Sequence, residues 1–190
     1  MKNFRLVVLI EIALCAAFAM LLDFIPSIKL SPAISISFKM VPIFIVAFRW
    51  GVKAGFVSGL LWGLLKVVTG DAAGGILTPL QGFIEYFIAF AFIGIAGFFQ
   101  PLIQSSIQEG SRRKAVFWAA IGVFFGSLAR YFWHFLAGFI FWGKYAPKGQ
   151  SAVLYSFIAN GTSMIGSFIL CAIILGILIS MAPILVKKLA

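Results

Sequence analysis

The chain has 190 residues, of which 63% are hydrophobic and only 11% are charged. Its mean hydropathy of +1.11 exceeds what a soluble domain hides behind a polar surface, so we expect the surrounding solvent to be lipid. The formal net charge of +10 is spread in short clusters between apolar runs, which argues against the single basic surface of a nucleic-acid-binding protein.

At about 20 residues per span, this length allows roughly six transmembrane helices. We therefore predict an all-α membrane protein, a six-transmembrane-helix bundle, with residues 1–190 forming one domain. The first helix is predicted over 4–24 and ends near Pro26, which cannot donate a backbone hydrogen bond. The connection 27–39 is polar, but its apolar residues alternate and predict a partly extended segment.

A short helix over 40–49 and a third helix over 53–68 follow. The glycine-rich residues 69–75 predict a surface loop. The fourth helix is expected over 77–99 and ends at Pro101, before a polar stretch over 104–114. The fifth is expected over 116–142. The last apolar run, 152–186, would be on the order of 50 Å long as one helix, so part of it must project beyond the bilayer or bend.

Lysine and arginine remain on the cytoplasmic side of a membrane protein. In the predicted topology, nine of these residues lie on the side that carries both termini and five on the other. We therefore expect both termini in the cytoplasm of a multi-pass protein of the bacterial cell membrane. The loops after the first, third and fifth helices then face outward.

Polar side chains inside the apolar runs cost roughly 2.5 to 3.5 kcal/mol each even on permissive insertion scales, so each one needs an explanation. They are Glu11, Glu85, Arg130, His134 and Asn160. Arg130 and His134 lie on one helix face because they are four residues apart. Glu85, His134 and Asn160 come from three helices but are predicted at one depth near the outer surface, which indicates a pocket.

The composition of this pocket predicts its ligand. A carboxylate, an imidazole and an amide can hydrogen-bond an amino-substituted heterocycle, and the nearby aromatic rings attract a cation. Those rings belong to Tyr86, Trp133, Trp142, Tyr145 and Tyr155. Simpler interpretations stay open: interfacial aromatic residues, a structural pair between Arg130 and Glu85, and a contact near the cytoplasmic end for Glu11.

Two further patterns bear on function. Ala13 and Ala17 form a small-xxx-small pair that would let another helix approach closely, either within this bundle or from a partner. The sequence has no phosphate-binding GxxxxGK[ST] loop, no HExxH and no GxSxG, and it contains one histidine. We therefore predict no enzymatic activity, no metal site and no cofactor.

Several segments together resemble the thiamine-specific S component of energy-coupling factor transporters, the ThiT (YuaJ) family. They are QGFIEY at 81–86, RYFWHFLAG at 130–138, FWGKYA at 141–146, YS at 155–156, NG at 160–161, EIA at 11–13 and LWG at 61–63. The resemblance covers nearly the whole chain. Two differences are Arg130, where the family often has lysine, and the absence of a tryptophan in 27–39.

This resemblance implies a six-helix bundle with a thiamine site near the outer surface, capped by the loop between the first two helices. It implies that Glu85 and His134 hold the aminopyrimidine and that Trp142 and Tyr86 pack on or beside the rings. Tyr155 and Asn160 would complete the polar contacts.

The resemblance also implies partners. Ala13 and Ala17 would dock a transmembrane coupling subunit, the T component, which carries two cytoplasmic ATPase subunits, and membrane lipid would surround the chain. Two other functions remain as hypotheses. One is an autonomous carrier or small channel, and the other is an intramembrane lipid-modifying enzyme that uses Glu85, His134 and Arg130.

Overall fold

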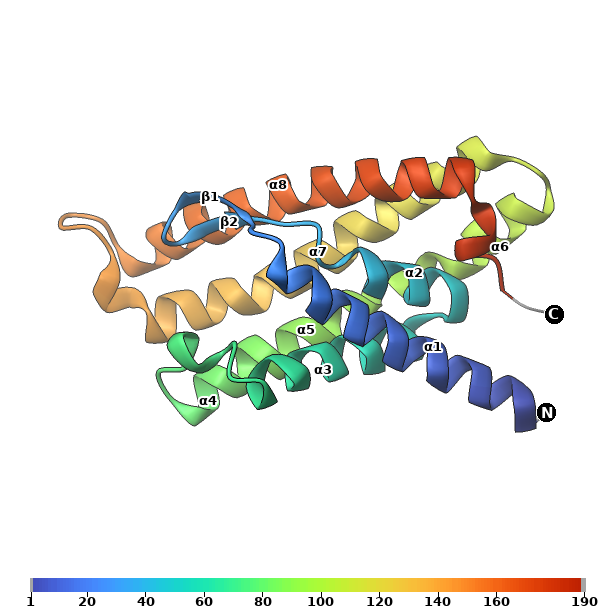
Figure 1. Cartoon of the computed structure of the whole chain (residues 1–190). Coiled ribbons are helices and arrows are strands. Elements are labelled where there is room, and N and C mark those ends of the chain that lie inside the picture. The colour runs from blue at the N-terminus through green and yellow to red at the C-terminus, as the bar shows by residue number, and fades with distance from the viewer. Residues whose placement is uncertain (1, 189–190) are drawn as a thin grey trace.

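The computed structural model describes the backbone of residues 2–188 and the side chains of residues 5–188. The chain folds into six helical stretches, which Figure 1 shows packed as a bundle. They are α1 (Lys2–Leu21), α2 (Val41–Trp50), α3 (Val52–Val68), a composite helix from α4 to α6, α7 (Arg112–Phe141) and α8 (Ala152–Met181). The predicted all-α membrane protein is thereby confirmed.

Four of these stretches are long and apolar enough to cross a bilayer. They are Arg5–Phe24, Pro79–Gln108, Arg112–Phe141 and Ala152–Met181. The helices α2 and α3 are shorter, and Gly51 joins them at φ +88°, a conformation that glycine adopts without steric cost.

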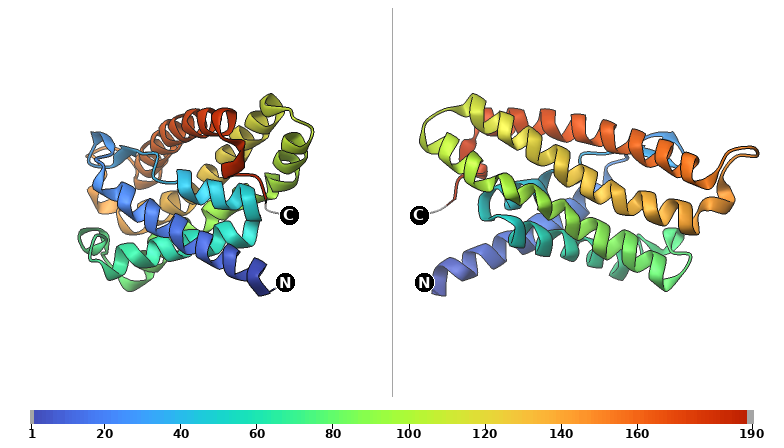
Figure 2. Two further views of the ribbon diagram at one scale, coloured as in Figure 1. Left: turned by 45° about the vertical axis from the view of Figure 1, so that its right-hand side comes forward. Right: turned by 180° about the vertical axis from the view of Figure 1, so that it is seen from behind.

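Both ends of the chain lie at the same end of the bundle. The helix α1 begins there, and the short turn η6 (Pro183–Leu185) lies beside it, as Figures 1 and 2 show. We call this the terminal end. The opposite end, the loop end, holds the hairpin after α1, the connection after α3 and the turn η5 (Gly143–Tyr145) before α8. The three predicted outward loops therefore share one side.

The composite helix differs from the prediction, which ended it at Pro101. It continues through α4 (Pro79–Gly82), the π-helical η3 (Phe83–Ile88), α5 (Ala89–Phe92), the 3₁₀ segment η4 (Ile93–Phe99) and α6 (Gln100–Gln108). Pro101 lies in the first turn of α6 after the tighter η4. A first-turn proline loses no helical hydrogen bond, so the helix passes through it.

Glycines bring α3 unusually close to this composite helix. A Cβ placed on Gly59 would lie 2.9 Å from the Phe90 carbonyl carbon, and one on Gly63 would lie 2.8 Å from the Tyr86 carbonyl carbon. Both distances are well below an ordinary contact between carbon atoms. Small residues of this kind let helices pack when lipid surrounds them, and here they hold α3 against the π-helical turn η3.

The polar connection after α1 forms the predicted extended segment. Its strands β1 (Ile28–Ser31) and β2 (Ile34–Ile36) pair in antiparallel fashion. Serines of α8 fasten this hairpin and its exit, since Ser163 Oγ accepts from Ser35 N and Ser167 Oγ accepts from Ser37 N, each at 3.1 Å. The hairpin therefore lies along α8 at the loop end (Figure 1).

Polar contacts also fasten the terminal end. Trp50 Nε1 donates to Glu11 Oε2 at 2.6 Å, and Arg49 Nε lies 3.2 Å from the same oxygen. The last apolar run, 152–186, bends, which is one of its two expected outcomes: α8 ends at Met181 and the chain turns at Ala182. Gln104 holds this turned segment, because its amide donates to the carbonyl oxygens of Phe48 and Val186 at 2.9 and 2.7 Å.

Candidate ligand-binding site

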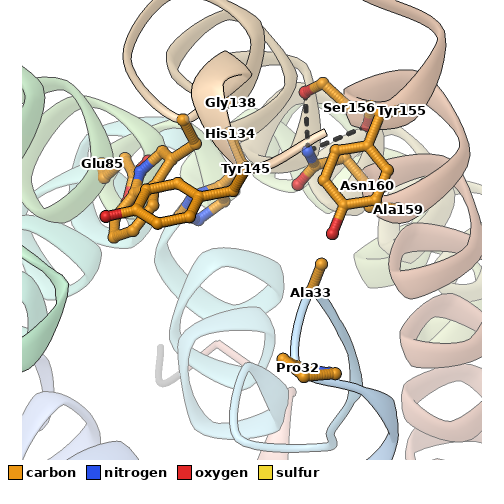
Figure 3. A pocket seen from close by; sticks show the side chains of 11 residues that line it. Pro32, Ala33, Glu85, His134, Gly138, Tyr145, Tyr155, Ser156, Ala159 and Asn160 are labelled. Carbon is orange, nitrogen blue, oxygen red and sulfur yellow. Dashed lines mark hydrogen bonds between the residues drawn. The ribbon is translucent and has the colours of Figure 1, made fainter. Parts of the chain in front are cut away.

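A cavity of about 440 Å³ opens at the loop end, within the size range of small-molecule sites. Figure 3 shows side chains from the composite helix, α7, α8 and the β1–β2 turn facing it. Its lining residues are Pro32, Ala33, Glu85, His134, Gly138, Trp142, Tyr145, Tyr155, Ser156, Ala159 and Asn160. Glu85, His134 and Asn160 are therefore brought together, as the sequence predicted.

Glu85 lies in the π-helical turn η3. Its carboxylate oxygen Oε1 accepts a hydrogen bond of 3.0 Å from Trp142 Nε1. A π turn inserts one additional residue into a helix and is frequent at functional sites. Gln81, one turn earlier, also hydrogen-bonds this carboxylate. A carboxylate has about four lone-pair sites, so some remain for a ligand that donates hydrogen bonds.

His134 projects from α7 between this cavity and a second one. Arg130 Nε, one turn earlier, donates to His134 Nε2 at 3.4 Å. An imidazole nitrogen that accepts a hydrogen bond carries no proton, so Nδ1 is the donor of a neutral His134. The imidazole thus adds a donor to a cavity in which Glu85 is an acceptor.

Asn160 is oriented by Ser156 on the preceding turn of α8. Its Nδ2 donates to the Ser156 carbonyl oxygen at 3.0 Å and lies 3.2 Å from Ser156 Oγ (dashed in Figure 3). Ser156 Oγ in turn donates to the Phe135 carbonyl oxygen on α7 at 2.8 Å. Gly138 leaves room for this arrangement, because a Cβ there would lie 3.2 Å from Asn160 Nδ2.

A second cavity of about 270 Å³ adjoins the first and shares Ala33, His134 and Asn160 with it. Asp23, which follows α1, lines this second cavity and pairs with two of its lysines. Its carboxylate lies 3.1 Å from Lys39 Nζ and 3.1 Å from Lys66 Nζ. Trp62 Nε1 donates to it at 3.0 Å.

Sequence reasoning missed Asp23. The pattern that could have found it is an acidic residue at the outer end of the first helix, together with two lysines predicted on the same side. Lys66 also pairs with Asp71, so the ion-pair network reaches the loop after α3. The hairpin is therefore fastened on its α1 side as well as along α8.

Arg130 lines only the second cavity. Its guanidinium carbon lies 4.3 Å from the Phe90 ring centroid and 5.0 Å from that of Trp62, so aromatic faces stabilise the cation. Its buried Nη1 has no hydrogen-bond partner among the described residues. The structural pair with Glu85 left open by the sequence is not among the ion pairs in this part of the chain.

Three sets of predicted residues lie elsewhere. Tyr86 lines neither cavity, and its ring packs against Phe90 at 5.9 Å between centroids. Ala13 and Ala17 lie on the exposed face of α1, on the part of the helix that the bundle leaves uncovered. Glu11 is tied to Arg49 and Trp50, far along α1 from Asp23.

The fold and the cavity together define a multi-pass helical membrane protein with a small-molecule pocket at one end. Residues 9–187 match the family model described as thiamine transporter protein. The chain is 40% identical to the thiamine transporter ThiT of Lacticaseibacillus paracasei, covering 94% of this chain and 90% of that one. It is 42% identical to ThiT of Bacillus subtilis, covering 97% and 96%.

A solved structure of ThiT from Listeria monocytogenes has a TM-score of 0.92 and 43% identity to this chain, covering 96% of it and 98% of that structure. The chain belongs to the thiamine transporter family. This family consists of transporters, so the chain is not an enzyme and the hypothesis of lipid modification is wrong.

Proposed function

We propose that this chain binds thiamine in the larger cavity and acts as the substrate-binding S component of an energy-coupling factor transporter, with the whole chain as one domain. The observation that carries the proposal is that Glu85, His134 and Asn160 share one cavity with aromatic rings. Thiamine joins a flat aminopyrimidine ring to a flat, cationic thiazolium ring through a methylene group, and this lining offers an acceptor, a donor and ring faces.

In this proposal, Glu85 accepts hydrogen bonds from the aminopyrimidine and His134 donates to it. Trp142 and Tyr155 face the cationic ring, and Asn160 completes the polar contacts. Arg130 acts from the smaller cavity, where its buried Nη1 is available to the polar substituent of the ligand. Tyr86 supports the turn that carries Glu85, through its packing on Phe90.

We further propose that transport energy comes from partner subunits: the T component in the membrane and two ATPases in the cytoplasm. The sequence contains no phosphate-binding loop of the P-loop kind. The exposed Ala13 and Ala17 on α1 offer small side chains that let a partner helix pack closely. The loop end then faces outward and both termini face the cytoplasm, in keeping with the lysine and arginine distribution.

Thiamine titration monitored by tryptophan fluorescence tests the binding proposal. The chain has five tryptophans, and Trp142 lines the cavity. We expect Glu85→Gln to weaken binding by about tenfold or more, because a carboxylate forms stronger hydrogen bonds than an amide. Glu109→Gln on the exposed turn after α6 is the matched control and should bind as the wild type does. Equal affinity of both variants would exclude Glu85 from the site.

The partner proposal is tested separately. Ala13→Trp should leave thiamine affinity unchanged but abolish uptake by cells that produce the coupling subunit and the ATPases, because the larger side chain prevents close helix packing. Val57→Trp, on an exposed position of α3, provides a comparison at another outer face. Uptake by vesicles that contain this chain alone would instead support an autonomous carrier.

A further inference from the structure

A basic pocket lies at the terminal end, far from the ligand cavities. It has a volume of about 380 Å³ and is bounded by the turn before α7 and the segment after α8. Arg112 and Lys187 line it, and Ile179, Pro183 and Ile184 form its apolar wall. Figure 2 shows that the start of α7 and the end of α8 lie side by side at this end.

The cations of this pocket have few internal partners. Arg112 Nη1 donates to the Ser180 carbonyl oxygen at 2.8 Å, which leaves the other guanidinium donors for a ligand. The Lys187 ammonium forms no ion pair with the described residues. The acidic residue on the adjoining turn, Glu109, pairs with Lys114 at 3.3 Å. The pocket therefore has the chemistry of an anion site.

An apolar groove adjoins the basic pocket along the seam between α7 and α8. It has a volume of about 590 Å³ and is lined by Val116, Ala172, Gly176 and Ile177, among others. Ser180 also lines the groove, so the hydrogen bond from Arg112 to its carbonyl marks the place where pocket and groove meet. A basic pocket joined to an apolar groove by this hydrogen bond matches a molecule with an anionic head and a hydrocarbon tail.

We propose that this end of the α7–α8 seam binds one anionic phospholipid, with its phosphodiester between Arg112 and Lys187 and one acyl chain in the groove at Gly176. Basic pockets between membrane helices are suited to such headgroups. The apolar groove favours binding of a lipid over free phosphate, because inorganic phosphate would leave this apolar surface uncovered. The bound lipid fastens the segment after α8, which Gln104 already holds through Val186.

The test uses the full chain purified in a mild detergent, mixed with phosphatidylglycerol or with phosphatidylcholine of the same acyl chains. Native mass spectrometry counts the lipids that each protein molecule retains. We expect one phosphatidylglycerol to be retained in preference to phosphatidylcholine. Arg112→Gln combined with Lys187→Gln should lower its retention by about tenfold or more. Arg113→Gln combined with Lys53→Gln removes the same charge outside the pocket and should have little effect.

A second variant tests the groove without changing any charge. Gly176→Leu fills it and should also lower phosphatidylglycerol retention; the first added carbon is tolerated, since a Cβ there would lie 3.5 Å from Val116 Cγ1. Equal losses of phosphatidylglycerol retention in the two double variants would overturn the proposal. The overall positive charge of this end, and not the pocket, would then explain binding. Full retention by Gly176→Leu, or displacement of the lipid by inorganic phosphate, would also overturn the proposal.

Discussion

The close approach of α3 to the turn that carries Glu85 predicts a strong effect of one methyl group. In Gly63→Ala, the new Cβ would lie 2.8 Å from the Tyr86 carbonyl carbon and closer still to its oxygen. Carbon atoms pack best at about 3.5 to 4.0 Å. The oxygen is the limiting contact, so the two backbones must separate by more than about 1 Å, and Glu85, which precedes Tyr86 in η3, moves with them.

Two effects of opposite sign act on stability. Alanine in a helix interior is favoured over glycine by about 0.5 to 1 kcal/mol, whereas an added group in a packed contact typically costs about 1 to 3 kcal/mol. The clash is with rigid backbone, so we expect the cost to prevail and the melting temperature of Gly63→Ala to fall. The displaced carboxylate should weaken thiamine binding by about tenfold, measured by tryptophan fluorescence titration.

Gly161→Ala is the matched control. Gly161 is also inside a long helix and adjoins Asn160, but a Cβ there would meet nothing within 4 Å. Helix propensity then acts alone, so this variant should melt at the wild-type temperature or above and bind thiamine normally. If Gly63→Ala behaved like Gly161→Ala in both measurements, the proposed support of Glu85 by α3 would be refuted.

Two other substitutions probe the surroundings of the site. Gly138→Ala should weaken thiamine binding by about tenfold in the same titration, because its Cβ would overlap the Ser156 hydroxyl that orients Asn160; unchanged affinity would remove Asn160 from the ligand contacts. Asp23→Asn should lower the melting temperature by several degrees, because it deprives Lys39 of its carboxylate partner in a mostly buried network. An unaltered melting curve would show that this network does not stabilise the fold.

The helices were predictable because hydropathy and proline dominate where spans lie, and lipid leaves the chain few alternatives. The end at Pro101 was wrong, since a proline that opens a new helical turn after a 3₁₀ segment has the same sequence as one that ends a helix. The π-helical form of η3 has no signature in the sequence. Its close contact with α3 depends on Gly59 and Gly63, which are distant from it in the chain.

The site was predictable to the extent that polar residues are costly within a span. This reasoning identified Glu85, His134 and Asn160, and the structure brings them to one cavity. It failed for Asp23, because an acidic residue at the end of a helix costs little by itself and its importance arises from Lys39 and Lys66. Contacts between loops depend on tertiary structure and cannot be derived from the cost of burial in one helix.

The two adjoining cavities differ in charge, and this difference would orient a ligand. The larger cavity is lined by one carboxylate, Glu85, and by no lysine or arginine among the described residues. The smaller cavity is net positive, since Lys39, Lys66 and Arg130 outnumber Asp23. Two unit charges about 4 Å apart interact by about 4 kcal/mol at an effective dielectric constant of 20. The charge of Glu85 therefore favours a cationic molecule in the larger cavity, with the amino group of its aminopyrimidine beside the carboxylate, while an electron-rich substituent is favoured toward Arg130. His134 lines both cavities, so a ligand that spans them contacts the imidazole ring of His134 whichever way round it binds.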